Sequence, residues 1–420
     1  MPLDVSIIGL GRVGLPLALS FADRGLSVLG VDNDPDRLEA IRAARMPFDE
    51  AGTQELLERV AESSRLSLSD RVADAAQADH VVITLGTPSF SHIEIDMRAI
   101  RSALDDLLPV LRPGHSLILR STIAPGTTDF VAGYLAKQRG FDIGEEIFVA
   151  HAPERIAAGR FLEEIGTLPC IVGGVGEHSG EQVGRLFEVF GAPIVQTTPV
   201  QAELAKIWTN ILRYTHFALP NLLMMDCEQY GANVFDVIDL INRDYPRGGI
   251  ARPGLTAGSC LRKDFAFSEE RSHAPGMLLA VSRVNESVPV FLVEGIKRRT
   301  GGDLAGRKVA VLGLAFKRDT DDERDSLSHK LIRLLERELA DVAVHDPRVA
   351  TPTQPFGETV IDAQVIVIAT NHSDFERPGT LQAIADSAAS DCLIVDPWNS
   401  LGAAQVFAYA PEVAALTAAQ

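Results

Sequence analysis

The chain has 420 residues, is 46% hydrophobic and 23% charged, and carries a formal net charge of −18 at pH 7. This composition indicates a globular protein long enough for two or three domains, and the acidic balance argues against nucleic acid or an anionic membrane as the main partner. The 4 cysteines form no CxxC pair and no metal-site spacing with histidine. We therefore expect free thiols in a reducing cytoplasm and no metal site. No apolar run is long enough to span a bilayer, so a soluble protein is expected.

The chain begins with a buried strand, a glycine turn, an apolar helix and a second strand. Gly9, Gly11 and Gly14 form a GxGxxG pattern between the first strand and the helix. Such glycines permit a tight turn, close approach of a pyrophosphate and close helix–strand packing. The second strand ends in Asp32, whose carboxylate can accept hydrogen bonds from a ribose diol and repels a 2′-phosphate. The pattern predicts a domain that binds NAD in preference to NADP.

Further buried strands are expected within residues 80–88, 115–128 and 145–155, and each apolar run ends in small, hydroxyl or charged residues. Ligands in open α/β sheets lie beyond the carboxyl ends of the strands. Thr87, Thr122 and Glu154 fall at such ends, although a helix cap or turn is an alternative role for either threonine. The predicted cofactor site comprises Gly9, Gly11, Arg12, Val13, Gly14, Asp32, Thr87 and Thr122.

Residues 200–233 have helical periodicity with few breakers apart from Pro220, which predicts a long helix between domains or across a subunit interface. Lys206 and Asn210 are four residues apart and share one face, with Glu203 on the same side. A lysine in an apolar helix is commonly a snorkelling surface residue. Its alignment with an asparagine favours a functional role.

A second βαβ set starts after the Gly-rich segment 298–307 and lacks GxGxxG. Lys317, Arg318 and Arg324 surround its first strand-end loop, which suits a diphosphate that is not part of NAD. Alternatively, the neighbouring acids simply pair with these cations; they are Asp319, Asp321, Asp322 and Glu323. The expected fold is α/β, with two Rossmann-like parallel-sheet domains joined by a central long-helix domain.

Cys260 lies in a loop, PGLTAGSCLRKD, between the helical middle and the second α/β part. The small residues before it allow a substrate to approach the sulfur, and Arg262 and Lys263 would favour a thiolate if they lie near it. A thiolate beside NAD can attack an aldehyde; the thiohemiacetal gives up a hydride and the thioester is hydrolysed to a carboxylate. A lone cysteine is commonly a small buried hydrophobe, but the flanking glycine, lysine and aspartate favour the nucleophile.

Over nearly its whole length the chain resembles the UDP-glucose/GDP-mannose dehydrogenase family of nucleotide-sugar 6-dehydrogenases. The matching segments are GLGRVGLPLA (9–18), GTP (86–88), STIAPGTT (121–128), PER (153–155), AELAKIWTN (202–210), GSCLRKD (258–264), VNESVP (284–289) and GLAFKRDTDDERDS (313–326). The resemblance implies an NAD-dependent, four-electron oxidation of a sugar CH2OH to a carboxylate. It also implies an NAD-binding domain at 1–198, a central domain for dimerisation and catalysis at 199–300, and a UDP-sugar-binding domain at 301–420.

The resemblance further implies roles for individual residues. Cys260 would be the nucleophile, Lys206 and Asn210 would stabilise oxyanion charge at C6, and Glu154 would be the base for thioester hydrolysis. Asp264 and Thr122 would position the water or assist proton transfer. The implied substrate contacts are Arg155, Lys206, Asn210, Arg252, Gly258, Lys317 and Arg324, and one of Arg243, Arg247 and Arg252 would reach the substrate of a neighbouring subunit in a homodimer or larger homo-oligomer.

The segments 151–174 and 245–264 resemble the branch that acts on UDP-N-acetylhexosamines more than the NPEFLREG and GFGGSC patterns of the glucose and mannose enzymes. We therefore expect UDP-N-acetylglucosamine or UDP-N-acetylmannosamine as substrate, with UDP-glucose as the alternative. The chain departs from the family at Asn221-Leu222, where Asn-Glu is usual, and at Leu255 and Ala257-Gly258, where paired glycines are usual. Both departures concern the sugar pocket.

Three other functional classes fit the sequence less well. A hydroxyacid dehydrogenase with a Lys–Asn helix needs neither the thiol nor a second α/β domain. A non-catalytic NAD-sensing protein would not need to keep the residues that perform the chemistry. An epimerase or dehydratase requires Tyr-x-x-x-Lys, whereas Tyr214 is followed four residues later by Ala218. The sequence therefore predicts an enzyme.

Overall fold

The computed structural model describes residues 2–87, 97–256, 258–269, 273, 275–377 and 379–411, and for Ser259 and Cys260 it describes the backbone. The chain divides into two compact units. The first unit comprises Met1–Thr209 and Ala266–Arg271, and the second comprises Asn210–Phe265 and Ser272–Gln420. Among the described residues, no helix is long and apolar enough to cross a membrane.

The first unit is built on an eight-stranded sheet in the order β3-β2-β1-β4-β5-β6-β7-β8. Its strands are β1 (Leu3–Ile8), β2 (Val28–Val31), β3 (Leu66–Ser69), β4 (Ala78–Ile83), β5 (Ser116–Leu119), β6 (Phe148–His151), β7 (Cys170–Gly174) and β8 (Ile194–Thr197). Neighbouring strands are parallel except for β6 and β7, which pair antiparallel. The strand order reverses between β1 and β4, and in such sheets a crevice opens at the carboxyl ends of these strands.

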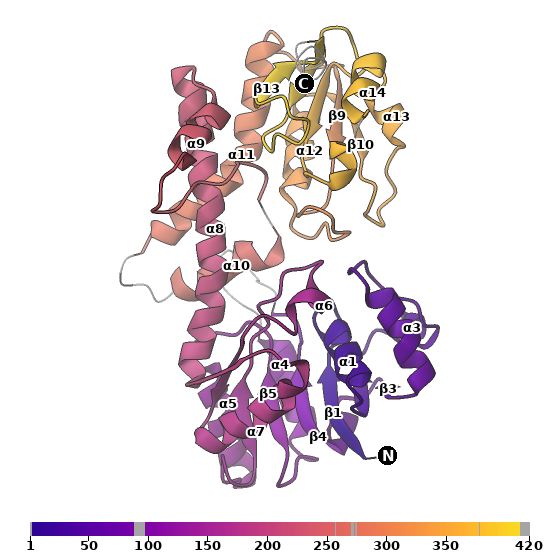
Figure 1. The fold of residues 1–420 in the computed structure, drawn as a ribbon, viewed down its shortest axis with the longest axis vertical. Coiled ribbons are helices and arrows are strands. Elements are labelled where there is room, and N and C mark those ends of the chain that lie inside the picture. The colour runs from indigo at the N-terminus through magenta and orange to yellow at the C-terminus, as the bar shows by residue number, and fades with distance from the viewer. Residues whose placement is uncertain are drawn as a thin grey trace. The chain divides into compact units, whose positions relative to one another are not determined.

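Helices and short 3-10 segments connect these strands (Figure 1). They are α1 (Gly14–Asp23), α2 (Pro35–Arg42), α3 (Thr53–Ser63), η1 (Val72–Gln77), α4 (Arg98–Leu107), α5 (Thr127–Arg139), α6 (Phe161–Glu164), α7 (Glu177–Phe187) and η2 (Glu188–Phe190). Successive residues of a strand point to opposite faces. Accordingly, Ile7 belongs to one core cluster and Ile8 to another. The strands that are covered on both faces are continuously apolar, which is why the sequence predicted β1, β2, β4, β5 and β6. The sequence did not predict β3, β7 and β8, and β3 and β8 contain polar residues and are only partly buried.

The predicted long helix is α8 (Pro199–Tyr230), whose 32 residues span about 48 Å. It continues through Pro220 and is visible as one long helix in Figure 1. Three further helices follow, namely α9 (Val234–Asn242), α10 (Ser259–Glu269) and α11 (Met277–Arg299). The loop predicted around Cys260 is wrong in one respect, because Ser259 to Asp264 already form the start of α10. Leu261, Arg262 and Lys263 are good helix formers. The helix begins directly after Gly258, whose φ of +102° is not helical.

The second unit ends in a five-stranded sheet in the order β10-β9-β11-β12-β13. The elements are β9 (Lys308–Leu312), α12 (Leu327–Arg337), β10 (Asp341–His345), α13 (Phe356–Val360), β11 (Val365–Ile368), η3 (Ser373–Glu376), α14 (Thr380–Ser387), β12 (Leu393–Val395) and β13 (Phe407–Tyr409). Only the short edge strand β13, which the sequence did not predict, pairs antiparallel within the described part of this sheet. The predicted fold class, two largely parallel α/β sheets with a central helical region, is confirmed. The three domain boundaries stay a prediction.

Candidate active site

The glycine turn between β1 and α1 has the geometry of a dinucleotide site. Gly9 has φ of +96°, and a Cβ on Gly14 would lie 1.8 Å from the carbonyl oxygen of Gly9, so both positions require glycine. A Cβ on Gly11 would meet no described atom within 4 Å. Packing within the chain therefore does not demand Gly11, and the open space beside it fits a pyrophosphate. Val13 is the N-cap of α1 and makes no side-chain cap bond among the described residues, so the helix amides can bind an anion.

Asp32 connects this turn to the end of β2. Its carboxylate accepts hydrogen bonds from the amide of Leu10 at 2.6 Å and from the amide of Asp34 at 3.0 Å. Nη1 of Arg37 lies 2.9 and 2.8 Å from the two carboxylate oxygens. Sequence reasoning missed Arg37, although an arginine five residues after the acid was the available signal. An arginine here can accommodate a 2′-phosphate, so Asp32 and Arg37 have opposite effects on cofactor choice.

Replacing Asp32 by serine is expected to lower the preference for NAD over NADP by about tenfold or more, which corresponds to about 1.4 kcal/mol. The variant removes the charge that repels the 2′-phosphate and releases the Arg37 guanidinium from its carboxylate partner. The measurement is the ratio of kcat/KM for the two cofactors. Asp36→Ser is the matched control, because it removes an exposed acid from the same helix start. An unchanged ratio in Asp32→Ser would contradict the role given to Asp32.

The ends of β4 and β5 are tied together by hydroxyl groups. Thr87 Oγ1 donates to the carbonyl oxygen of Thr122 at 2.8 Å, and Ser121 Oγ donates to that of Leu85 at 2.6 Å. The two threonines predicted for the cofactor site therefore lie side by side. Arg12, from the glycine turn, stacks over Phe48 with 5.1 Å between the guanidinium carbon and the ring centroid.

Glu154, the predicted base, is held by a buried arginine. Nη2 of Arg120 lies 2.5 Å from Oε2 of Glu154, and the amide of Ile156 donates to Oε1 at 2.7 Å. Arg120 also donates to the carbonyl of Ala152 at 3.0 Å and stacks on Phe187. The two charged side chains are 5% and 10% exposed, so the pair is almost dry. The ion pair and the amide hydrogen bond hold the Glu154 carboxylate in one orientation.

The sequence did not identify Arg120, although a charged residue directly after the apolar run LIL was a signal.

Arg155, a predicted substrate contact, donates from Nη2 to the carbonyl of Pro169 at 2.6 Å. It lines a small pocket together with Arg120, Glu154 and Cys170. Burial raises the pKa of Cys170, so this thiol is a poor nucleophile.

His151 ends β6 three residues before Glu154 and is fully buried. Its Nδ1 donates to the carbonyl oxygen of Leu119 at 2.9 Å. Burial lowers the pKa of His151 from 6.5 to about 3; the bond to Leu119 opposes this shift, whereas Arg120 and Lys206 add to it. The imidazole is therefore neutral at neutral pH.

Acidification is expected to destabilise the protein through His151. Between pH 6.5 and its folded pKa of about 3, the unfolded chain binds more protons at this residue than the folded chain does, so stability is lost as the pH falls. The loss is about 2 kcal/mol between pH 6.5 and pH 5. The denaturation midpoint measured against pH should fall less in His151→Gln than in the wild type. His178→Gln removes an exposed histidine and should leave the slope unchanged; equal slopes in all three proteins would contradict this assignment.

The start of α8 belongs to the first unit and is fixed by Glu203. This fully buried carboxylate accepts hydrogen bonds from the amides of Gly126 and Thr128, at 2.6 and 2.8 Å, and from the Thr128 hydroxyl at 2.6 Å. Burial raises the pKa of Glu203, and the hydrogen bonds oppose that shift. Glu203 thus caps the start of α5. Lys206, which is half-buried, follows Glu203 by just under one helical turn.

In the second unit, Asp264 orients Asn210. Nδ2 of Asn210 donates to Oδ2 of Asp264 at 2.5 Å, and Lys263 Nζ lies 2.9 Å from Oδ1. Asp264 is 1% exposed and Asn210 is 4% exposed. Two of the predicted catalytic residues, 54 positions apart in the chain, therefore form one buried hydrogen-bonded unit.

The segment before Cys260 is shaped by contacts within the second unit. The amide of Gly254 donates to Oδ1 of Asn221 at 2.8 Å, so Asn221 has a structural role. A Cβ on Gly254 would lie 2.5 Å from the ring of Trp398, and a Cβ on Gly258, which has φ of +102°, would lie 2.6 Å from the ring of Phe316. Both glycines are therefore required by packing. Ala257, one of the predicted departures, lies outside the described residues.

The cations that follow Cys260 are paired with acids. Nε of Arg262 lies 2.6 Å from Glu286, and Lys263 binds Asp264. Arg262 and Lys263 each have an acidic partner, and their effect on the thiol of Cys260 stays a prediction.

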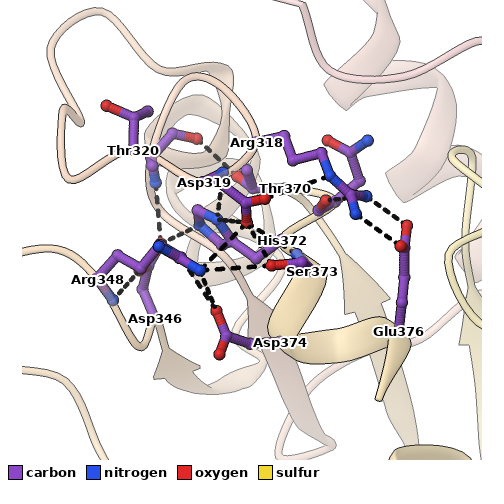
Figure 2. A network of polar contacts seen from close by, with 12 residues as sticks. Arg318, Asp319, Thr320, Asp346, Arg348, Thr370, His372, Ser373, Asp374 and Glu376 are labelled. Carbon is purple, nitrogen blue, oxygen red and sulfur yellow. Dashed lines mark hydrogen bonds and ion pairs between the residues drawn. The ribbon is translucent and has the colours of Figure 1, made fainter. Parts of the chain in front are cut away.

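The loop after β9 contains the other predicted substrate residues. Arg324 binds Asp322 through two bonds of 2.8 and 2.7 Å, and Arg318 binds Glu376 (Figure 2). Arg324 therefore pairs with one of the neighbouring acids, whereas Arg318 binds Glu376 and lies 3.4 Å from Asp319. The substrate role of Arg324 stays a prediction. Lys317 is half-buried, Arg252 is exposed, and both belong to the second unit.

A glycine turn with a dinucleotide geometry, an anchored acid at β2 and a second α/β sheet without that turn define an NAD-dependent oxidoreductase with two Rossmann-like folds. The chain belongs to the UDP-glucose/GDP-mannose dehydrogenase family. The family's NAD-binding domain matches residues 3–191, its central domain 200–287 and its UDP-binding domain 310–403. The protein is thus an NAD-dependent nucleotide-sugar dehydrogenase, as the sequence predicted.

Several proteins similar to this chain are named for UDP-N-acetylmannosamine. The chain is 32% identical over 379 residues to UDP-N-acetyl-D-mannosamine dehydrogenase of Pyrococcus horikoshii, covering 89% of this chain and 90% of that protein. A solved structure of UDP-D-ManNAc dehydrogenase from the same organism has a TM-score of 0.87 at 31% identity, covering 94% of this chain and 95% of that chain. The UDP-N-acetyl-mannosamine dehydrogenase structure from Staphylococcus aureus has a TM-score of 0.85 at 31% identity, with the same coverage.

Proposed function

We propose that the enzyme oxidises the C6 hydroxymethyl of a UDP-N-acetylhexosamine to the uronic acid, with UDP-N-acetylmannosamine as the preferred substrate. The observation that supports this substrate is the similarity, over about nine-tenths of the chain, to a dehydrogenase named for it. The segment 151–174, with Glu154 and Arg155, is consistent with the same branch. The C2 configuration of the sugar separates this substrate from UDP-N-acetylglucosamine, which the same pattern also allows.

The chemistry proceeds in three stages. The glycine turn and Asp32 would hold NAD, which would supply the hydride acceptor for both oxidations. In the first stage C6 loses a hydride and the hydroxyl loses its proton, which gives an aldehyde. The thiolate of Cys260 then forms a bond to C6, and the resulting thiohemiacetal loses a second hydride to give a thioester. Finally a water oxygen attacks C6, the C–S bond breaks, and the thiolate leaves the carboxylate product.

We assign the remaining roles from the contacts of each residue. Lys206 and Asn210 stabilise the charge that develops on the C6 oxygen, and Asp264 fixes the amide of Asn210 for this task. Glu154 takes the proton of the attacking water, and its contacts with Arg120 and the Ile156 amide hold the carboxylate in place for this step. Thr122 assists proton transfer at the same step.

We also propose that the enzyme is a cytoplasmic homodimer or larger homo-oligomer formed along α8. Trp208, Leu212, Leu219 and Leu222 are 52%, 55%, 53% and 45% exposed. Their spacings of four, seven and three residues place them on one face of the helix. An exposed apolar stripe of this kind is typical of an interface. A solution molar mass of at least two chains, measured by light scattering, is the expected result.

The experiment that tests the function is NADH release from limiting sugar, run to completion with UDP-N-acetylmannosamine, UDP-N-acetylglucosamine, UDP-glucose and GDP-mannose. We expect two NADH per UDP-N-acetylmannosamine. Two NADH per UDP-glucose, with none from the N-acetylated sugars, would keep the chemistry and overturn the substrate. One NADH per sugar would mean that oxidation stops at the aldehyde or a ketone, and the thioester route would be wrong.

A further inference from the structure

The loop between β9 and α12 is anchored at its start by a buried acid. Asp346 follows β10 and is 4% exposed, and its Oδ2 accepts hydrogen bonds from the amides of Leu314 and Ala315 at 2.6 and 3.0 Å. The hydroxyl of Thr370 donates a hydrogen bond to the carbonyl oxygen of Ala315 at 2.6 Å. Asp32 occupies the corresponding position after β2. In the second sheet, Asp346 binds two amides of the loop between β9 and α12, and it also binds His372, which follows β11.

His372 connects this anchor to a second point on the same loop. It is fully buried, and its Nδ1 accepts a hydrogen bond from the amide of Asp319 at 2.9 Å. The proton of the neutral ring is therefore on Nε2, which donates to Oδ2 of Asp346 at 3.1 Å. Figure 2 shows the imidazole between Asp319 and Asp346. His372 thus binds Asp319 at one end of the short stretch 314–319 directly, and it reaches the other end through Asp346, which binds the amides of Leu314 and Ala315. Lys317 lies between the two ends.

The second anchor point holds a backbone conformation that the residue would not adopt readily. Asp319 has φ of +53°, which is unfavourable for a residue with a Cβ. Its Oδ1 accepts two hydrogen bonds of 2.9 Å from the amide and hydroxyl of Ser373, and Arg348 lies 3.4 Å away. Arg348 also binds Asp374 at 3.0 Å. A set of contacts this dense, around a strained residue, indicates that the conformation of the loop matters for more than chain reversal.

We propose that His372 is a positioning residue for the nucleotide-sugar site: by bridging Asp346 and Asp319 it holds the 314–319 loop so that Lys317 is ready to bind the diphosphate. This inference rests on the proposed function, in which Lys317 contacts the substrate. A lysine on a fixed loop loses less conformational freedom on binding than one on a mobile loop. The bridge therefore acts on affinity for the nucleotide, whereas the cofactor turn, which is in the other unit, is independent of it.

Two substitutions separate the halves of the bridge. In His372→Asn the side-chain oxygen can take the place of Nδ1 and keep the bond from Asp319, but the bond to Asp346 is lost. In His372→Gln the side-chain nitrogen can take the place of Nε2 and keep the bond to Asp346, but the bond from Asp319 is lost. His372→Phe removes both and keeps the ring. His329→Gln, in which a partly exposed histidine beside Glu323 is replaced, is the matched control.

The measurements are calorimetric titration of each full-length variant with UDP and with NAD, together with KM and kcat. We expect His372→Phe to weaken UDP binding and raise the nucleotide-sugar KM by about tenfold or more, with kcat at saturation and NAD binding unchanged. Asn and Gln should each lose part of that affinity, and His329→Gln none. UDP affinity equal to wild type in the Phe variant, or an equal loss of UDP and NAD binding, would overturn the proposal. If the Phe variant does not fold, wild-type UDP affinity in both Asn and Gln would do the same.

The UDP titration does not depend on turnover. If wild type binds UDP but forms no uronate, the proposed function fails while the role of His372 is still decided by the variants. If wild type forms uronate and the variants bind UDP normally, the role of His372 fails alone.

Discussion

Replacing Cys260 by alanine is expected to abolish uronate formation and to lower the turnover rate by about 10⁴-fold or more, the scale seen when a covalent nucleophile is removed. Without the thiol no bond to C6 can form, so the second hydride has no thiohemiacetal to leave from. NAD binding should be unchanged, because the glycine turn and Asp32 lie in the first unit. The measurement is NADH per sugar together with detection of the carboxylate by mass spectrometry.

Other cysteines of the same chain provide the controls for this experiment. Cys392 is fully buried, and burial raises its pKa to about 12, while burial also raises the pKa of Cys227. Both therefore remain neutral thiols at neutral pH, and Cys392→Ala and Cys227→Ala should keep wild-type stoichiometry. Wild-type turnover in Cys260→Ala would remove Cys260 from the mechanism, and loss of turnover in all three variants would point to a general effect on folding.

The features that the sequence predicted well are those encoded by neighbouring residues. The glycine turn could be read from Gly9, Gly11 and Gly14 because these residues are close together in the sequence, and local geometry demands glycine at Gly9 and Gly14. Most strands of the two sheets were visible because strands buried on both faces are continuously apolar, whereas β3, β7, β8 and β13 were not predicted. The long periodic segment gave α8, although Pro220 lies inside it. These signals were sufficient for the fold class and, with the order of the motifs, for the enzyme class.

The features that the sequence did not predict depend on contacts between distant residues. Arg120 and Glu154 are 34 positions apart, and His372 and Asp346 are 26 apart, so no local pattern connects either pair. The start of α10 was taken for a loop because its glycine and small residues resemble loop composition. Gly258 is in fact required by the nearby ring of Phe316, which only the folded chain brings beside it.

The same reasoning explains why charged residues were harder to interpret than glycines. Arg262, Arg318 and Arg324 follow or precede several acids in the sequence, and spacing alone does not say which partner each will take. The structure pairs Arg318 with Glu376 and Arg324 with Asp322. We assign Lys317 of this loop to the substrate because the contacts of Asp346 and His372 fix its backbone on both sides.

Replacing Glu154 by glutamine is expected to stop the reaction at the thioester. The amide can still accept the hydrogen bond from Ile156, but it cannot take a proton from water, so hydrolysis should slow by about 10² to 10⁴-fold. Both oxidations precede that step, so the first turnover should still release two NADH per active site before the rate falls. The enzyme should then carry the sugar acyl group, which intact-mass measurement after rapid quenching detects as an adduct on the peptide that contains Cys260.

Replacing Arg120 should also affect thioester hydrolysis, because Arg120 contacts Glu154. Arg120→Met removes the buried ion pair that holds the Glu154 carboxylate in place, so thioester hydrolysis should slow relative to wild type. Glu163→Gln is the control, because Glu163 is 64% exposed and pairs with Arg160. A Glu154→Gln variant that loses the first and second NADH equally, without an adduct, would place Glu154 before hydride transfer. The Arg120–Glu154 pair would then organise the substrate, and the base for water would have to be another residue.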